Sequence, residues 1–233
     1  MPNRSSSHPS IEKVVDEKAG AWSTWLQTKP QDKPPKPVVT ISREPGSGGK
    51  IVAREVADLL GLHVFDRELI QRIAASAQMR EEVVKTLDER QNKLMDNWIL
   101  AFFTDRYLWP DLYIKHLAKV LFTIGQRGDA VIIGRGANFL IPPEACFRVR
   151  VVAPKEKRAQ AVAKRYTISL SDAEKFIQSK AHDRKGFAMQ HFNADIADAV
   201  HYDLVINTGH LSFTDAAQMI KAAIKIRYKF KTA

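Results

Sequence analysis

The chain has 233 residues, 45% of them hydrophobic, and its 36 basic residues against 26 acidic ones give a net charge of +10. This length can bury one large domain, or one domain with an appendage, and the positive balance favours a polyanionic ligand without naming one. A single cysteine, no apolar N-terminal signal and no run near the roughly 20 apolar residues of a membrane span exclude an internal disulfide and predict a cytoplasmic protein without a membrane segment.

The N-terminal segment combines one helical face with a proline-rich linker. Apolar residues recur every three or four positions between Ile11 and Leu26, which is typical of an amphipathic helix. That helix packs either on its own domain, which is the simpler reading, or on a second subunit. Four prolines within residues 29–37 favour an extended spacer. We therefore expect an appendage at 1–37 and a main domain at 38–230.

A β-branched run at 38–42, a glycine-rich turn and a helix follow in the order of a phosphate-binding loop. Gly46, Gly48 and Gly49 allow main-chain N–H groups to point at an anion near the start of the helix. The usual pattern G-x-x-x-x-G-K-[ST] is altered, because Gly49 and Lys50 stand where its lysine and hydroxyl belong and Arg43 replaces its first glycine. We call residues 43–50 the phosphate loop.

Strands and helices alternate after this loop. Further strands are predicted at 63–66, 130–134, 147–153 and 203–207. Helices are predicted at 48–61, throughout 67–127, from Pro154 onward, at 171–182 and at 212–228. Short apolar strands separated by helices indicate a parallel sheet covered on both faces, with ligands at the carboxyl ends of the strands.

Charged residues are concentrated at those strand ends. Arg135 lies between two glycines directly after a strand, and its planar guanidinium suits a phosphate, although a surface arginine is the plain alternative. Asp66 and Arg72 follow the second strand and are placed to face the same site. The basic stretch 180–195 forms either a lid that brings Arg184 over phosphates or an ordinary charged connection.

Four motifs together resemble the cytidylate kinase-like family, a branch of the P-loop nucleoside monophosphate kinases. They are SREPGSGGK at 42–50, FDREL at 65–69, GRGAN at 134–138, and YDLVIN at 202–207 followed by Leu-Ser. The resemblance implies a three-layer α/β P-loop NTPase fold with a parallel sheet. It also implies a helical acceptor-binding insertion at about 67–127 and a lid at about 180–198.

The resemblance also implies residue roles. The phosphate loop would hold the donor's β-phosphate, and Arg158 and Arg184 would surround the transferred group. Two departures change base recognition and the lid, since Gly136 replaces an aspartate that helps recognise cytosine and Gln190 replaces an arginine. The expected sites are catalytic Arg43, Lys50, Arg135 and Arg184; donor-binding Gly46, Ser47, Gly48, Gly49, Lys50 and Arg158; and acceptor-binding Asp66, Arg72 and Arg135.

The predicted reaction is transfer of the ATP γ-phosphoryl group to a nucleoside monophosphate or a related phosphorylated acceptor, with Mg²⁺ on the donor. Mg²⁺ would be held by Ser47, by Asp66 through water, or by the phosphates alone. The main alternative is a non-catalytic nucleotide-binding regulatory module. For the basic tail at 221–231, a solvated helix face is favoured over a nucleic-acid-binding surface. Aromatic residues at 98–113 indicate packing or a subunit interface, and a homodimer is expected.

Overall fold

The computed structural model describes residues 37–106, 108 and 110–229. The predicted N-terminal helix and most of its linker lie outside the described residues. Contacts divide the chain into Met1–Pro34 and Pro35–Ala233, and only the second unit is treated below. Its first half contains β1 (Val38–Arg43), α2 (Gly49–Leu60), β2 (His63–Phe65), α3 (Arg67–Ala75), α4 (Ala77–Val84), α5 (Glu89–Thr104) and α6 (Leu112–Arg127). The second half contains β3 (Ala130–Ile133), α7 (Ala137–Leu140), β4 (Cys146–Val152), α8 (Lys155–Tyr166), α9 (Leu170–Phe192), β5 (Leu204–Asn207) and α10 (Phe213–Lys229).

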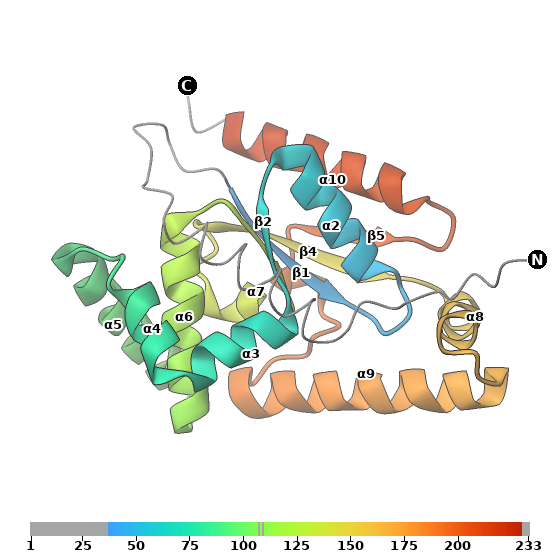
Figure 1. Ribbon diagram of the computed structural model, residues 1–233, viewed down its shortest axis with the longest axis horizontal. Helices are drawn as coiled ribbons and strands as arrows, with labels where there is room; N and C mark the ends of the chain where they lie inside the picture. The colour runs from blue at the N-terminus through green and yellow to red at the C-terminus, as the bar shows by residue number, and fades with distance from the viewer. Residues whose placement is uncertain (1–36, 107, 109, 230–233) are drawn as a thin grey trace, which may run out of the picture. The chain divides into compact units, whose positions relative to one another are not determined.

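The five strands form one parallel sheet in the order β2-β3-β1-β4-β5. Helices α2 and α10 lie side by side on one face of this sheet, and α3, α6 and α9 lie on the other (Figure 1). The core on the α2 side includes Val39 and Ile41 of β1 and Val149 and Val151 of β4, all almost fully buried. The three-layer α/β fold predicted from the sequence is confirmed.

The helical region predicted at 67–127 divides into four separate helices. Each of the four starts at a side chain that accepts a main-chain N–H: Asp66 for α3, Ser76 for α4, Asp88 for α5 and Asp111 for α6. Asp88 and Gln91 form a reciprocal capping box. We call residues 67–127 the helical insertion.

Helix α9 continues well beyond His182, where the sequence analysis ended it, and reaches Phe192. Gly186 does not interrupt it, and Asn193 ends it in a left-handed conformation with φ of 47°. Phe192 is fully buried, with its ring 6.2 Å from the ring of Phe102 and 5.1 Å from that of Phe139. The segment predicted as a lid is therefore helical up to residue 192.

The aromatic residues of the insertion contribute to packing. Phe102 and Phe103 are buried, and Trp98 donates from its indole nitrogen to the Leu140 carbonyl at 3.0 Å. Within the described residues, no helix is long and apolar enough to cross a membrane. In the basic tail, Arg227 pairs with Asp203 at 2.6 Å, so this arginine of the tail stabilises the fold.

Candidate active site at the phosphate loop

The phosphate loop connects β1 to α2 in a conformation that requires glycine. Gly46 has φ of 83°, and a Cβ built there would lie 2.5 Å from the main-chain oxygen of Arg158. Gly48 has φ of 75°, and a Cβ there would overlap the ring of Phe213. Both positions exclude side chains through backbone angle and through space.

We expect Gly46→Ala to destabilise the protein by roughly 2 to 4 kcal/mol, because it adds a left-handed conformational penalty to a clash with main chain. Gly186→Ala is the matched control, since a Cβ there has no neighbour within 4 Å and alanine favours a helix interior. Urea denaturation of both variants tests this. Equal stability of the two proteins would contradict the close approach of Arg158.

The start of α2 presents main-chain donors without partners. No side chain caps this helix. The described residues provide no hydrogen-bond acceptor for the N–H groups of Gly48, Gly49 or Lys50. Unpaired N–H groups at a helix N-terminus attract an anion through both hydrogen bonding and the helix dipole. The loop therefore has the donor geometry of a phosphate site.

Ser47 does not present its hydroxyl to this site. It is 1% exposed, and its Oγ lies 3.0 Å from the Glu44 carbonyl and 3.1 Å from the Val151 carbonyl. A hydroxyl held between two inward carbonyls stabilises the loop. Its orientation gives no support to the expectation that Ser47 coordinates a metal.

Arg158 also stabilises the loop. Its Nε donates to the Ala153 carbonyl at 2.8 Å and lies 3.3 Å from Glu44 Oε2, and its Nη1 donates to the Pro45 carbonyl at 3.4 Å. Glu44 in turn accepts from the Ala153 N–H at 3.1 Å. These contacts attach the outer edge of the phosphate loop to the start of α8. Lys50, at the other edge, lies 3.7 Å from Glu68.

Arg43 lies beneath the loop. Its Nη1 lies so close to Gly134 that a Cβ at that glycine would overlap it, and its buried Nε has no hydrogen-bond partner. Burial lowers the Arg43 pKa to about 9, and the positive charge of Arg184 contributes to the same shift. A buried cation without a countercharge destabilises the folded protein, and a bound anion would offset that cost.

Arg184 reaches this position from α9. Its Nη1 donates to the main-chain carbonyl of Arg43 at 2.6 Å, across 141 positions of sequence. Burial is the main cause that lowers the pKa of Arg184 to about 10, and the positive charges of Arg67 and Arg150 contribute to the same shift. Arg184 therefore reaches the first residue of the phosphate loop from within α9.

Arg135 lies on the neighbouring strand end. It adopts φ of 57°, which is unusual for a residue with a side chain, and its Nε and Nη2 are buried without hydrogen-bond partners. Its guanidinium carbon lies 5.6 Å from the centre of the Phe187 ring. Burial is the main cause that lowers its pKa. The strained backbone and unsatisfied donors are typical of a ligand site.

Asp66, Arg67 and Arg72 follow the second strand. Asp66 is 7% exposed and caps α3 by accepting from the Leu69 N–H at 3.0 Å. Arg72 is exposed near the end of α3, and its side chain has no described contact with the phosphate loop. Arg67 instead lies close enough for its charge to lower the pKa of Arg43, Arg135 and Arg184. We call Arg43, Arg67, Arg135 and Arg184 the arginine cluster.

Arg67 and Arg150 were not among the site residues predicted from the sequence. Arg150 is 7% exposed on β4, donates to Ser42 Oγ at 3.2 Å and lies 5.6 Å from the Tyr202 ring centre. The alternation of arginine and valine at 148–151 was a signal, because it places both arginines on the sheet face opposite the α2 core. Across the residues that the structure describes, no group of three or more His, Cys, Asp or Glu side chains could hold a metal ion.

A parallel sheet with a glycine-rich loop at the end of its central strand, flanked by the arginine cluster, is the arrangement of a P-loop NTPase fold. Residues 38–210 match the cytidylate kinase-like family. The chain belongs to that family.

Individual relatives agree with this assignment. Cytidylate kinases of Methanopyrus kandleri and Pyrococcus horikoshii are 28% and 30% identical to this chain, covering 80% and 81% of it and 92% and 88% of their own lengths. A crystal structure of an uncharacterized protein from Eubacterium ventriosum has a TM-score of 0.63 and 21% identity, and the match covers 82% of this chain and 98% of that one. That structure shares the fold.

Proposed function

We propose that the protein transfers the γ-phosphoryl group of ATP to a nucleoside monophosphate, with cytidylate as the first acceptor to test. The observation that carries the proposal is the concentration of three partly buried guanidinium groups, those of Arg43, Arg135 and Arg184, beside unpaired N–H groups of the phosphate loop. Such a site suits phosphoryl transfer, which requires mainly positioning and electrostatic stabilisation.

In the proposed reaction the bond between the γ-phosphorus and its bridging oxygen breaks, and an oxygen of the acceptor phosphate forms the new bond. The loop N–H groups and Arg43 would hold the donor phosphates. Arg135 and Arg184 would stabilise the charge of the transferred group, with Arg67 on the acceptor side. Arg72, expected there from the resemblance, remains a weaker candidate because its charge does not contribute to the pKa shifts of Arg43, Arg135 and Arg184, whereas that of Arg67 does.

Mg²⁺ is the usual partner of ATP in such reactions, and it would neutralise part of the donor charge. The described residues do not fit a protein-built magnesium site, since Ser47 Oγ is engaged with two carbonyls and Asp66 caps α3. We therefore assign the ion no protein ligand and derive no step through it.

A panel of nucleoside monophosphates incubated with ATP and Mg²⁺ tests the proposal, with chromatography to detect diphosphate products. We expect product with at least one acceptor, and cytidine diphosphate foremost. Calorimetry of ATP binding is measured in parallel. ATP binding without product from any acceptor would favour the second candidate, a regulatory module, whose motivation is the altered loop and the absence of a metal-binding hydroxyl.

A homodimer and a cytoplasmic location also belong to this proposal. Exposed apolar side chains on the insertion, including Leu100 at 69% and Leu112 at 70%, are compatible with a subunit contact. Light scattering on the intact chain tests the assembly.

A further inference from the structure

A second cationic site lies in the helical insertion. A cavity of about 610 Å³ is lined by residues of α4, α5 and α6 and by Lys85, next to α4, a volume within the range of small-molecule sites. None of its lining residues belongs to the phosphate loop or to the arginine cluster. Its lining residues are Ala77, Arg80, Glu81, Val84, Lys85, Asn92, Leu112, Lys115, His116 and Lys119. We call this space the insertion cavity.

The charges of the insertion cavity are unbalanced. Four of its lining side chains are basic and one is acidic. The acid, Glu81, already pairs with Lys85 at 2.8 Å, and Lys119 lies 3.4 Å from Asp96. Within the described part of the chain, Arg80 and Lys115 have no carboxylate partner, and Arg80 Nη1 donates to the Ala74 carbonyl at 2.5 Å. Two cations therefore remain available to a ligand.

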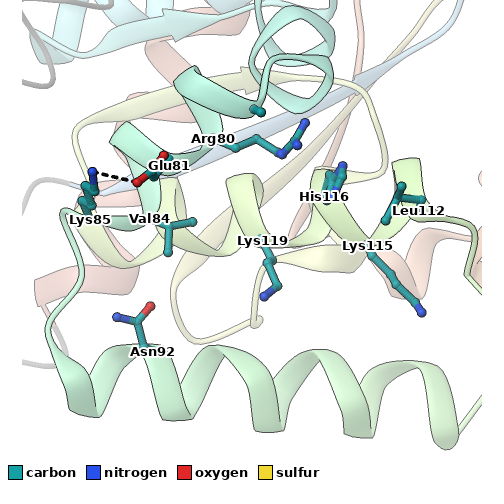
Figure 2. A pocket seen from close by; sticks show the side chains of 10 residues that line it. Arg80, Glu81, Val84, Lys85, Asn92, Leu112, Lys115, His116 and Lys119 are labelled. Carbon is teal, nitrogen blue, oxygen red and sulfur yellow. Dashed lines mark ion pairs between the residues drawn. The ribbon is translucent and has the colours of Figure 1, made fainter.

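The polar side chains that line the insertion cavity come from α4, α5 and α6. Figure 2 shows Arg80 of α4 directed toward His116 of α6, with Lys115 and Lys119 extending from α6 on the side where Asn92 of α5 lies. The positive charges of Arg80 and Lys119 lower the His116 pKa, after the larger effect of burial. Ala77, Val84 and Leu112 add apolar surface to the same cavity.

We propose that the insertion cavity binds a small organic anion with at least two negative charges, of the phosphorylated-metabolite class, at a site separate from the phosphate loop. Arg80 and Lys115 would contact the anionic groups, His116 would donate a hydrogen bond, and Val84 and Leu112 would cover the apolar part. A concave space lined by several cations favours a compact ligand over an extended nucleic-acid strand, which needs a groove.

Inorganic triphosphate is a suitable probe of the charge requirement, at about 0.15 M salt where exposed charges are screened beyond roughly 8 Å. Titration into the intact protein, followed by calorimetry, is expected to reveal two classes of site. Lys115→Glu should weaken one of them by at least about tenfold and leave the other within twofold. Lys225→Glu, an exposed lysine on α10, is the matched control and should retain both.

His116 supplies a local reading of occupancy. Its imidazole proton signal, assigned by its loss in His116→Asn, should show a raised pKa when triphosphate is added, because a bound anion offsets the neighbouring cations. The rise should persist in Arg43→Met, which alters only the phosphate loop site. This separates a failure of the insertion cavity from a failure of the proposed kinase site.

Three results would overturn the inference. One is a His116 pKa that does not change with triphosphate. Another is equal weakening by Lys115→Glu and Lys225→Glu, which would indicate general charge attraction. The third is binding of a single-stranded oligonucleotide that depends on Lys115 while triphosphate binding does not, which would assign this surface to nucleic acid.

Discussion

Arg135→Ala is expected to lower kcat by about a thousandfold or more while nucleotide affinity changes far less. A guanidinium that stabilises the transferring phosphoryl group can contribute this much to the rate. Arg135 fits such a role because its Nε and Nη2 are buried without partners, beside Arg43 and on a left-handed backbone. Initial rates with ATP and the best acceptor, at saturating concentrations of both, measure the effect.

Two controls test whether the loss of activity is specific to Arg135. Arg165→Ala removes an exposed arginine at the end of α8, whose described contact is with the Tyr166 ring at 5.6 Å, and should leave kcat within twofold. Arg135→Ala should unfold at nearly the same temperature as the native protein, because no hydrogen bond of Nε or Nη2 is lost. A kcat within threefold of the native value would remove Arg135 from the catalytic residues.

Arg43→Met is expected to abolish tight ATP binding and to stabilise the ligand-free protein. Folding lowers the Arg43 pKa from its ordinary value to about 9, so at neutral pH the folded state carries a protonated group that it disfavours. The unfolded chain binds more protons between pH 9 and the ordinary arginine pKa, and the penalty is relieved only as pH rises through that interval. Removing the charge should recover stability on the order of a few kcal/mol at neutral pH.

The same charge is what a phosphate needs, so ATP affinity should fall by about a hundredfold or more. Thermal unfolding at pH 7.5 and calorimetry with ATP measure the two effects on one sample. Arg54→Met is the matched control, since Arg54 is exposed on α2 and should change neither quantity. Loss of stability together with unchanged ATP affinity would assign Arg43 a purely structural role.

Local sequence was a good guide to the sheet and to the loop. Buried strands are short β-branched runs, and Gly46 and Gly48 of the loop occupy positive φ angles that few other residues adopt, so both features leave direct marks on residue type. The same holds for Arg135, whose flanking glycines both have positive φ. These predictions depend on neighbours along the chain.

The positions of other site residues depended on the rotation of the helix that carries them. Arg67 and Arg72 are five positions apart on α3, which separates their directions by about 140°. Leu69, Ile70 and Ile73 of α3 are buried, and this fixes the rotation of the helix. Arg67 and Arg72 are both exposed, but only the charge of Arg67 lowers the pKa of Arg43. The sequence contained both arginines but not the rotation that chooses between them.

Thus residue types alone determined the parallel sheet, the glycine-rich phosphate loop and membership of a kinase-like family. Tertiary structure alone decided that Ser47 faces inward, that α9 continues to Phe192 and that Arg184 meets the Arg43 carbonyl. The physical reason is distance along the chain. The contacts that set these outcomes join residues more than 100 positions apart, or depend on buried packing such as that of Phe192, and they form only when the whole core assembles.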